Sequence, residues 1–473
     1  MAKFQPGTDP EKLARVAELY YVDNLSYKEI IAELAREGIV PSTFTESNVA
    51  HWVEQARTLG VVAFYIDPSF ANSGRLNDRL SDRLMREFDL EEAIVVDTSP
   101  SVLQDTKAAD LHTSLANQTG MRLSEVLNAR TPVLVAGGRT VVQIARMINR
   151  RHRRRSNIRI DPLSGRNWTG SWQLDGTQDL ERPLDADDAA LIMASAFPKS
   201  GTRFSQIGHP LYAETTELAQ AIIRDHCAFL PGGEWNWGVP HRQTQHAICG
   251  IGVLHPQSGH RIMRFLEMYL REHGLTTSQD LEKLIEEGAL AKAVLPEEPD
   301  KSAPYLARVA GDLFGAFVFA AEHNLGYFGD IANRLFPCLP LPSELKEERL
   351  PKRDHYEGLL QKLDALNRRA IVMEWRHLRQ ASTWVTAGGT LKLSPIWTLL
   401  IIRYIEQSHR PSGIQKDSII SKLTTDTLTA QALLTALASF KKASDSVRQW
   451  YVDLASVLFQ EDGQVSKTGA GAQ

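Results

Sequence analysis

The 473-residue sequence predicts an α/β protein in which a small helical segment precedes a large domain with a mainly parallel sheet. Apolar residues recur at helical spacing through the first sixty or so positions. From residue 61 onward, short apolar strands alternate with glycine turns and helical runs, which is typical of βαβ units. We expect a helical domain over 1–62, the α/β domain over 63–460 and a disordered polar tail over 461–473.

The helical segment begins with a run in which Leu13, Val16 and Ala17 share one face. A second amphipathic run follows, and Ser26 with Glu29 predicts a capping box at its start. Gly38 is placed to end that helix. The third run, "ESNVAHWVEQARTLGVV", completes a pattern of three short helices with a break before the last.

Three helices in this order are the pattern of a helix-turn-helix, whose third helix fits the major groove of DNA. A small three-helix bundle used for dimerisation is the alternative. If the segment binds DNA, the contacting residues are expected to be Ser47, Asn48, His51, Gln55 and Arg57. Glu46 and Glu54 oppose phosphate, so one copy would bind weakly and a dimer or larger oligomer is implied.

The α/β domain is predicted from apolar runs that end in glycine or precede a helix. The strand-like runs are "EEAIVVD", "TPVLVA", "NIRID", "HAICGIGVL", "RRAIVMEW" and "STWVT". Ligands of open parallel sheets bind beyond the carboxyl ends of the strands. The turns that follow these runs are therefore the candidate binding elements.

One such turn comprises Gly137, Gly138, Arg139 and Thr140, between a strand and a helix start. Glycines allow close approach of the backbone to an anion, and free amides point at it. Arg139 adds a charge and Thr140 a hydroxyl. The turn lacks the GKS or GKT of a P-loop and is not GxGxxG, so a plain tight turn is the alternative.

Other strand ends carry similar groups. Gly388, Gly389 and Lys392 follow "STWVT", and the lysine is placed to meet a phosphate. Gly165 with Arg166 forms a further glycine-lined end. Several such turns in one sheet are expected to converge on one pocket.

Seven arginines lie within residues 146–159, at the end of the helix that follows Gly138. Cations at a helix C-terminus complement its dipole, so a solvated basic end that contacts an oligomer neighbour is one interpretation. An auxiliary contact with the DNA backbone is a second. A nuclear-import or RNA-binding patch is a third, if the source is eukaryotic.

Composition excludes several classes. Lys and Arg number 53 against 57 Asp and Glu, so any nucleic-acid site must be local. Cys227, Cys249 and Cys338 form no CxxC, which argues against disulfides and a cysteine-rich zinc site. The polar N-terminus and the short run "PIWTLLIIRYI" predict neither a signal peptide nor a membrane span. We expect a cytoplasmic, nucleoid-associated protein, or a nuclear one only in a eukaryote.

Further polar and aromatic groups are weaker candidates. The histidines His241, His246, His255 and His260 have no helical metal-ligand spacing and no carboxylate among them, so no metal or cofactor is expected. Trp235 and Trp237 are suited to stacking on a sugar ring or a base, or to packing under a loop, and we favour the packing. Lys199, Arg203 and His209 are candidate contacts to phosphate or hydroxyl groups.

The chain resembles the SorC family of bacterial sugar-responsive transcriptional regulators over nearly its whole length. The resemblance rests on the order and spacing of several segments, among them "LYYVDNLSYKEIIAEL", "SNVAHWVEQARTLGVV", "VAGGRTVVQIARMI", "HAICGIG", "AGDLFGAFVF", "TAGGTLKLSPIWTLL" and "KLTTDTLTAQALL". It implies an N-terminal helix-turn-helix and an effector domain similar to glucosamine-6-phosphate deaminase and ribose-5-phosphate isomerase. It also implies a sugar or sugar phosphate effector, commonly a tetramer, and a pocket bordered by Gly137–Thr140, Asp312 and Gly388–Lys392.

Two functions are compatible with these features. The first is a DNA-binding regulator whose operator binding is controlled by a sugar or sugar phosphate, without catalytic residues. The second is a phosphosugar isomerase or deaminase, which needs a carboxylate or histidine for proton transfer. Asp312 and Asp426 are the nearest candidates for that role, and the helical segment argues against it.

Overall fold

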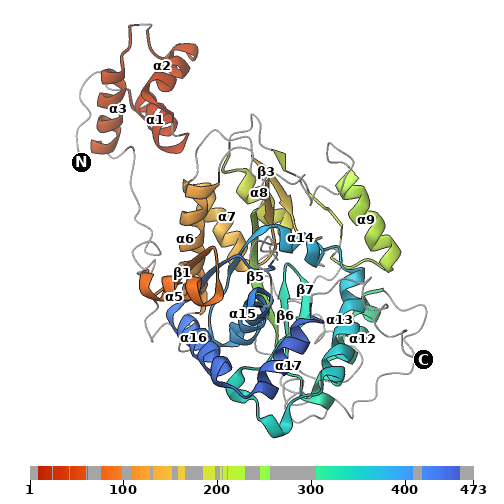
Figure 1. Ribbon diagram of the computed structural model, residues 1–473. Coiled ribbons are helices and arrows are strands. Elements are labelled where there is room, and N and C mark those ends of the chain that lie inside the picture. The colour runs from red at the N-terminus through yellow and green to blue at the C-terminus, as the bar shows by residue number, and fades with distance from the viewer. Residues whose placement is uncertain are drawn as a thin grey trace. The chain divides into compact units, whose positions relative to one another are not determined.

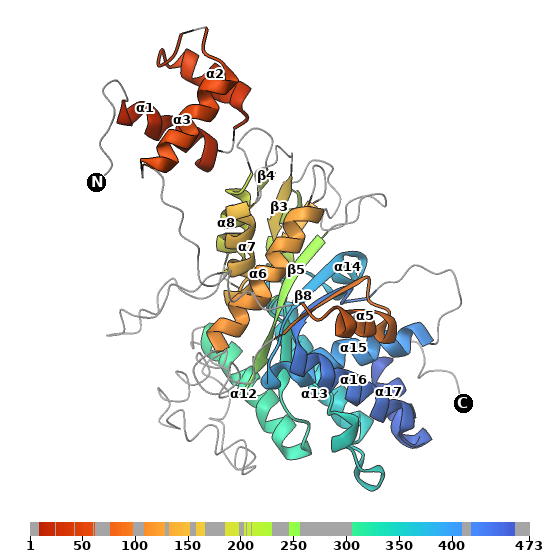
Figure 2. The ribbon, with the colours of Figure 1, turned by 90° about the vertical axis from the view of Figure 1, so that its left-hand side faces the viewer.

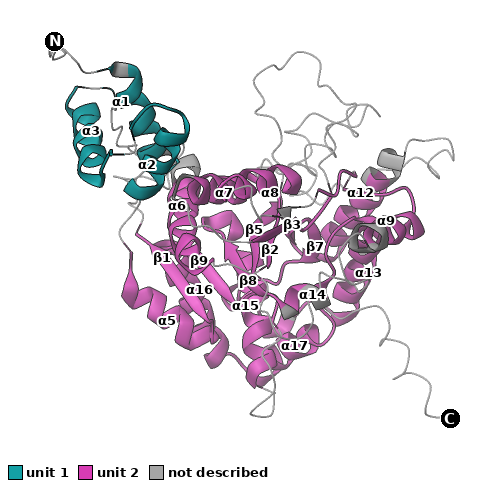
Figure 3. Cartoon of the chain, turned by 90° about the horizontal axis from the view of Figure 1, so that it is seen from above, with its two compact units in different colours: residues 1–72 teal, residues 73–473 magenta. Residues whose placement is uncertain are grey.

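A computed structural model divides the chain into two compact units, Met1–Asn72 and Ser73–Gln473 (Figure 3). It describes residues 9–23, 25–41, 43–59, 61, 76–97, 108–127, 132–151, 158–165, 185–197, 203–204, 206–209, 211–228, 246–255, 305–408 and 418–458. The predicted boundary after residue 62 and the tail from residue 461 lie outside these residues.

The first unit has the three helices that the sequence predicts. They are α1 (Pro10–Ala17), which continues into the π-helical η1 (Glu18–Val22), then α2 (Tyr27–Arg36) and α3 (Glu46–Thr58). Ser26 and Glu29 form the expected capping box of α2. Gly38 follows the helix at φ +71°, a left-handed conformation that glycine adopts without strain. Thr45 and Asn48 form a second capping box at α3.

A small apolar core holds these helices together. Val16, Ile30, Leu34 and Val49 are fully buried between them. Arg15 of α1 pairs with Glu37 just beyond α2, at 2.5 Å. The unit therefore has its own core, as a separate domain requires.

Among the residues that the structure describes, the second unit is built on a nine-stranded sheet that lies among the helices (Figure 1). Seven of its strands follow the order β1-β9-β8-β5-β2-β3-β4. All neighbours along this path are parallel, whereas β6 and β7 form an antiparallel hairpin that pairs with the second half of β5. The strands are β1 (Glu92–Val96), β2 (Pro132–Val135), β3 (Arg159–Pro162), β4 (Arg203–Phe204), β5 (His246–Leu254), β6 (Phe328–Ile331), β7 (Arg334–Pro337), β8 (Ser382–Thr386) and β9 (Lys422–Asp426).

Helices cover both faces of this sheet (Figure 2). They are α5 (Asp78–Phe88), α6 (Ala108–Val126), α7 (Arg139–Arg151), α8 (Ala186–Ala194), α9 (Thr216–Ala228), α12 (Tyr305–His323), α13 (Arg353–Arg369), α14 (Trp375–Gln380), α15 (Leu393–Ser408), α16 (Thr427–Lys442) and α17 (Asp445–Ala455). Every residue of β2 and of β8 is buried, which explains why both read as continuous apolar or small-residue runs. The mainly parallel α/β fold predicted from the sequence is confirmed.

The central strand β5 marks a switch in the direction of the connections. The helix after β2 is α7, which packs with α6 and α8 on one face. The helix after β8 is α15, which packs with α16 and α17 on the other face (Figure 2). Strands β2 and β8 both pair with β5, so the turns that follow them lie close together at the same edge of the sheet. One turn leads to a helix on one face and the other turn to a helix on the opposite face. Such a switch point is where open α/β sheets bind ligands.

The prediction of a strand at "RRAIVMEW" is wrong. Its two arginines, Arg368 and Arg369, end α13. Ala370 and Val372 make only isolated bridges to Tyr212 and Ser164. The run is apolar because it is buried beside the sheet, and a short buried segment cannot be told from a strand by periodicity.

No helix among the described residues combines the length and apolar character needed to cross a membrane.

Candidate functional site

The turn between β2 and α7 has an open helix N-terminus. Gly138 has φ +109°, and the first hydrogen bond into the helix runs from Val142 N to Gly138 O at 3.0 Å. The amides of the first turn therefore have no partner within the helix. No acidic residue lies in that turn, and Arg139 is exposed at its start. Free amides, the helix dipole and a guanidinium together favour an anion.

Gly137 allows this turn to lie against the start of α8. A Cβ at Gly137 would lie 3.0 Å from Ala186 N and 3.2 Å from Asp185 C, so a larger residue would have to move backbone. The structure therefore requires glycine at the two positions for different reasons. Gly137 has no room for a side chain, whereas Gly138 adopts a positive φ that side chains rarely allow.

The turn between β8 and α15 is not equivalent. Gly389 N donates to Asp426 Oδ2 at 2.9 Å and to Thr429 Oγ1 at 3.0 Å. Asp426 is fully buried and also caps α16. The amide is thus already paired with a carboxylate, which opposes an incoming anion. In this turn the group available to a phosphate is therefore the Lys392 side chain rather than the Gly389 amide.

That lysine, Lys392, ends a short 3-10 turn (Thr390–Lys392). Burial lowers its pKa to about 8, and Asp330 acts in the opposite direction. Asp330 lies on β6 and accepts a hydrogen bond from Gly252 N of β5 at 3.1 Å. No local pattern in the sequence marks Asp330, because its neighbours in the fold are far away along the chain.

Helix α6 contacts both turns. His112 Nδ1 lies 3.5 Å from Thr140 Oγ1 in the first turn. Leu115 lies against Gly388 in the second turn, where an added Cβ would be 2.9 Å from Leu115 Cδ1. Burial lowers the pKa of His112 to about 3, with smaller contributions from the charges of Lys392 and Arg139. Both cations therefore lie near one uncharged imidazole, and sequence analysis missed this residue.

The structure brings together most, not all, of the expected effector residues. Gly137–Thr140, Gly388–Gly389 and Lys392 lie around His112 at the carboxyl ends of β2 and β8. Asp312 lies on α12, exposed, and forms an ion pair with Arg369 of α13 rather than with either turn. Arg166 lies outside the described residues.

The remaining candidates do not form one cluster. His246 is the first residue of β5 and His255 follows its last, so the two histidines lie at opposite ends of this nine-residue strand. The described residues contain no group of three metal-ligating side chains. Arg203 lies on β4 and His209 is exposed beyond it. His241, His260, Trp235, Trp237 and Lys199 lie outside the described residues.

The arginine cluster does begin at the C-terminal end of a helix. Helix α7 ends at Arg151, and Arg146 is exposed on it. Arg159 is bound to Asp161 in β3 at 2.7 Å. The side chains of Arg150 and Arg151 and all of residues 152–157 lie outside the description.

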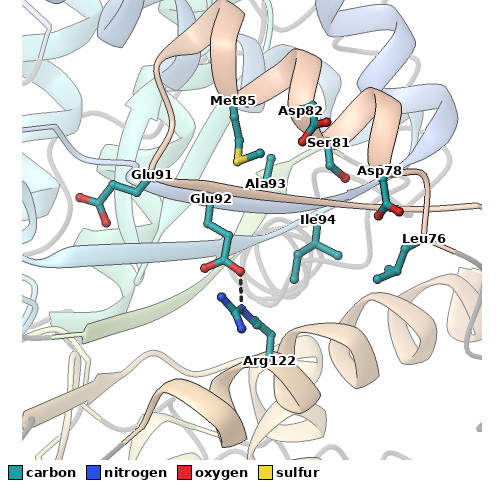
Figure 4. Close-up of a pocket in the computed structure, with 10 residues that line it drawn as sticks. All are labelled: Leu76, Asp78, Ser81, Asp82, Met85, Glu91, Glu92, Ala93, Ile94 and Arg122. Carbon is teal, nitrogen blue, oxygen red and sulfur yellow. Dashed lines mark hydrogen bonds and ion pairs between the residues drawn. The ribbon is translucent and has the colours of Figure 1, made fainter.

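A separate cleft of about 420 Å³ lies between α5, β1 and α6, near the amino end of the edge strand (Figure 4). Its lining residues are Leu76, Asp78, Ser81, Asp82, Met85, Glu91, Glu92, Ala93, Ile94 and Arg122. Arg122 is already paired with Glu92 at 2.5 Å and with Glu125 at 2.9 Å. With four carboxylates on its walls, the cleft is unsuited to an anionic ligand. The two glycine turns are the better candidate.

In the first unit, the expected DNA-contacting residues lie along α3. Ser47, Asn48, His51 and Arg57 are exposed, and Gln55 is half-buried. The capping box uses Asn48, whose Oδ1 accepts from Thr45 N at 2.9 Å. Arg57 pairs with Glu54 at 2.7 Å. Ser47 and His51 are therefore the most available of the five.

Comparison with known proteins gives one family and several structures. Residues 75–294 match the family model described as "Putative sugar-binding domain". The full-length sorbitol operon regulator SorC from Klebsiella pneumoniae is 17% identical, with 90% of this chain and 99% of that chain covered and a TM-score of 0.42. A DeoR family transcriptional regulator from Listeria monocytogenes is 16% identical (75% and 98% covered, TM-score 0.39). The probable sor operon regulator from Shigella flexneri is 14% identical (76% and 99% covered, TM-score 0.43).

No curated protein matches the chain. The family match covers the segment from α5 through β5, which includes the Gly137–Thr140 turn and His112. Residues 75–294 are thus similar to a sugar-binding domain. This match agrees with the sugar-binding effector domain that the resemblance to SorC-family regulators implied.

Proposed function

We propose that this protein is a DNA-binding transcriptional regulator of carbohydrate metabolism. In this proposal a sugar or sugar phosphate binds at the carboxyl ends of β2 and β8 and controls binding of the first unit to an operator. The observation that carries it is the open, cationic N-terminus of α7, within a segment that matches a sugar-binding domain. Copies of the chain would act together, as dimers or tetramers.

The effector site favours a ligand that carries one anionic group. The amides of the first turn of α7 and the guanidinium of Arg139 provide donors on one side. Lys392 provides a second cation, close enough to affect the pKa of the same histidine as Arg139. Each hydrogen bond to a charged group contributes about 1.5–3 kcal/mol. Three such bonds at the upper end of this range give about 9 kcal/mol, against the about 8.2 kcal/mol that micromolar binding requires.

The proposed DNA contact is made by α3. Its exposed polar side chains Ser47 and His51 lie one helical turn apart, on the same face. Lys28 lies near Glu46 at 4.0 Å, which reduces the repulsion between that carboxylate and phosphate. A single helix with so few cations binds weakly, so we propose that two units read two half-sites.

Control by the effector is proposed to be a population shift. A ligand favours whichever arrangement of subunits it binds more tightly. Half-sites on DNA are about 34 Å apart, so a small rotation between copies changes how well two α3 helices fit them. Whether the ligand releases or strengthens DNA binding depends on which arrangement it favours.

An isomerase or deaminase is the second candidate, and the carboxylates near the site are poorly placed for it. Asp426 is engaged with Gly389 and Thr429, and Asp330 with Gly252. Asp312 pairs with Arg369 at the surface. A general base must reach a substrate proton. Because these carboxylates already have partners, we favour a binding site over an active site. Turnover of a sugar phosphate by the purified protein would instead support the enzyme.

Calorimetric titration with sugar phosphates tests the effector site. Arg139→Gln and Lys392→Gln should each weaken binding by about tenfold or more, because each removes a charged hydrogen bond. Arg146→Gln is the matched control, since Arg146 is exposed on the same helix about two turns away. Equal affinity of all four proteins would refute this location of the site.

A further inference from the structure

His112 occupies a central position between the two glycine turns. It lies on α6, with Nδ1 3.5 Å from Thr140 Oγ1. Around it, Leu111 lies 3.8 Å from where a Cβ at Gly389 would be, and Leu115 contacts Gly388. One segment of α6 therefore contacts both turns, and His112 is the side chain of this segment that lies within 3.5 Å of Thr140 Oγ1 in the first turn.

Apart from the Thr140 hydroxyl, which lies against His112 Nδ1, the groups named for this site are donors. The α7 amides, Arg139 and Lys392 can donate hydrogen bonds but cannot accept them. The nearby carboxylates are engaged: Asp426 accepts from Gly389 N, and Asp330 accepts from Gly252 N. A sugar hydroxyl donates as well as accepts, so a site made only of donors leaves its proton unpaired.

His112 can supply the missing acceptor. Burial and the two neighbouring cations hold its pKa near 3, so the imidazole is uncharged at neutral pH. A neutral imidazole has one donor nitrogen and one acceptor nitrogen. If Nδ1–H donates to Thr140 Oγ1, Nε2 is left as the acceptor. No hydrogen bond to His112 Nε2 is found within the described part of the chain.

We propose that His112 is a specificity-determining residue of the effector site, and that its Nε2 accepts a hydrogen bond from a sugar hydroxyl next to the anionic group. This inference rests on the proposed function. It narrows the ligand to a polyol with one anionic group, in which a hydroxyl lies within a few bonds of that group. The anionic group is a phosphate or a carboxylate, since both fit amides and cations.

The test compares three proteins with several ligands by calorimetry at pH 7.5. The ligands are inorganic phosphate, glucose 6-phosphate, fructose 6-phosphate, ribose 5-phosphate and gluconate. His112→Phe keeps the ring and removes both hydrogen-bonding nitrogens. His112→Gln keeps an amide that can accept. Gluconate binding without sugar phosphate binding would identify a carboxylate as the anion.

His112→Phe is expected to weaken the tightest sugar ligand about tenfold, because one hydrogen bond to a buried partner is lost. Inorganic phosphate, which lacks the sugar, should bind the wild type and this variant within about twofold. His112→Gln should retain most of the wild-type affinity. A merely structural role of the imidazole would weaken phosphate and sugar ligand together, and that result would overturn the proposal.

Deoxy analogues of the tightest ligand give a second readout that does not depend on one variant folding. Wild type should bind one deoxy analogue about tenfold more weakly than the parent. His112→Phe should not distinguish the two, because the hydroxyl and the imidazole act as a pair. If wild type binds every deoxy analogue as tightly as the parent, the inference about His112 is wrong and the effector site remains. If neither phosphate nor any sugar ligand binds wild type, both fail.

Discussion

Replacing Gly388 by alanine is expected to destabilise the α/β unit strongly. A Cβ at this position would lie 2.4 Å from Asp426 Oδ2 and 2.9 Å from Leu115 Cδ1. Both distances are too short for real contacts, and Asp426 cannot move without cost because it is fully buried. The substitution adds a single methyl group, so any large effect must come from this crowding.

The size of the expected destabilisation follows from the hydrogen bonds that Asp426 accepts. Its carboxylate accepts from Gly389 N at 2.9 Å, from Thr429 N at 2.9 Å and from Thr429 Oγ1 at 2.6 Å. Displacing Oδ2 weakens at least one hydrogen bond to a charged group, worth about 1.5–3 kcal/mol. Overpacking a core costs about 1–3 kcal/mol. Together the two contributions give an expected loss of about 2.5–6 kcal/mol in the free energy of unfolding.

Urea unfolding of the full chain, followed by tryptophan fluorescence, measures this loss. Trp384 on β8 and Trp397 on α15 are buried on either side of the turn. Gly250→Ala is the matched control: the added Cβ has only Val141 Cγ2 nearby, at 3.8 Å. It should change stability by less than about 0.5 kcal/mol. Equal effects of the two substitutions would show that the crowding at Gly388 is not real.

Three further predictions concern pH and surface charge. Between pH 7 and 9.5 the affinity for a sugar phosphate should fall about tenfold, because Lys392, with a pKa of about 8, loses its charge; in Lys392→Arg it should stay flat. Below pH 6.5, His112 and His246 bind protons in the unfolded chain but not in the folded one, where their pKa values are lowered to about 3 and about 4. Stability should therefore fall by about 1.4 kcal/mol per pH unit for each histidine, and His112→Gln should make the slope measured by urea unfolding shallower. Asp312→Asn removes an exposed ion pair, so it should cost less than about 1 kcal/mol and leave sugar phosphate affinity within about twofold; a larger loss of affinity would place Asp312 in the pocket.

Local patterns predicted the fold class and many of its elements. The strands β1, β2, β3, β5 and β8 and the helices α2, α3 and α7 lie where apolar runs, capping residues and glycines indicated. The strand β9 was harder to predict, because four of the five residues of "KLTTD" are polar and the strand is buried by its neighbours rather than by its own composition. The β6–β7 hairpin and the order of strands depend on contacts between distant segments.

The site was predictable only in part, for the same reason. Glycine turns after strands are visible in the sequence, and both lie at the switch point. Their different chemistry is not visible, because it depends on Asp426, which is 37 residues beyond Gly389 and pairs with its amide. His112 and Asp330 enter the site from α6 and β6, and no local motif marks either residue.

Selection of bound fragments from genomic DNA, at fixed salt and with or without a mixture of sugar phosphates, tests the central claim most directly. A regulator should enrich a motif with repeated half-sites, and the recovery of that motif should change when the mixture is added. In Arg139→Gln the motif should be enriched as in wild type, but the mixture should have little effect. Failure to enrich any motif under either condition, at a salt concentration where random DNA is not retained, would contradict the account.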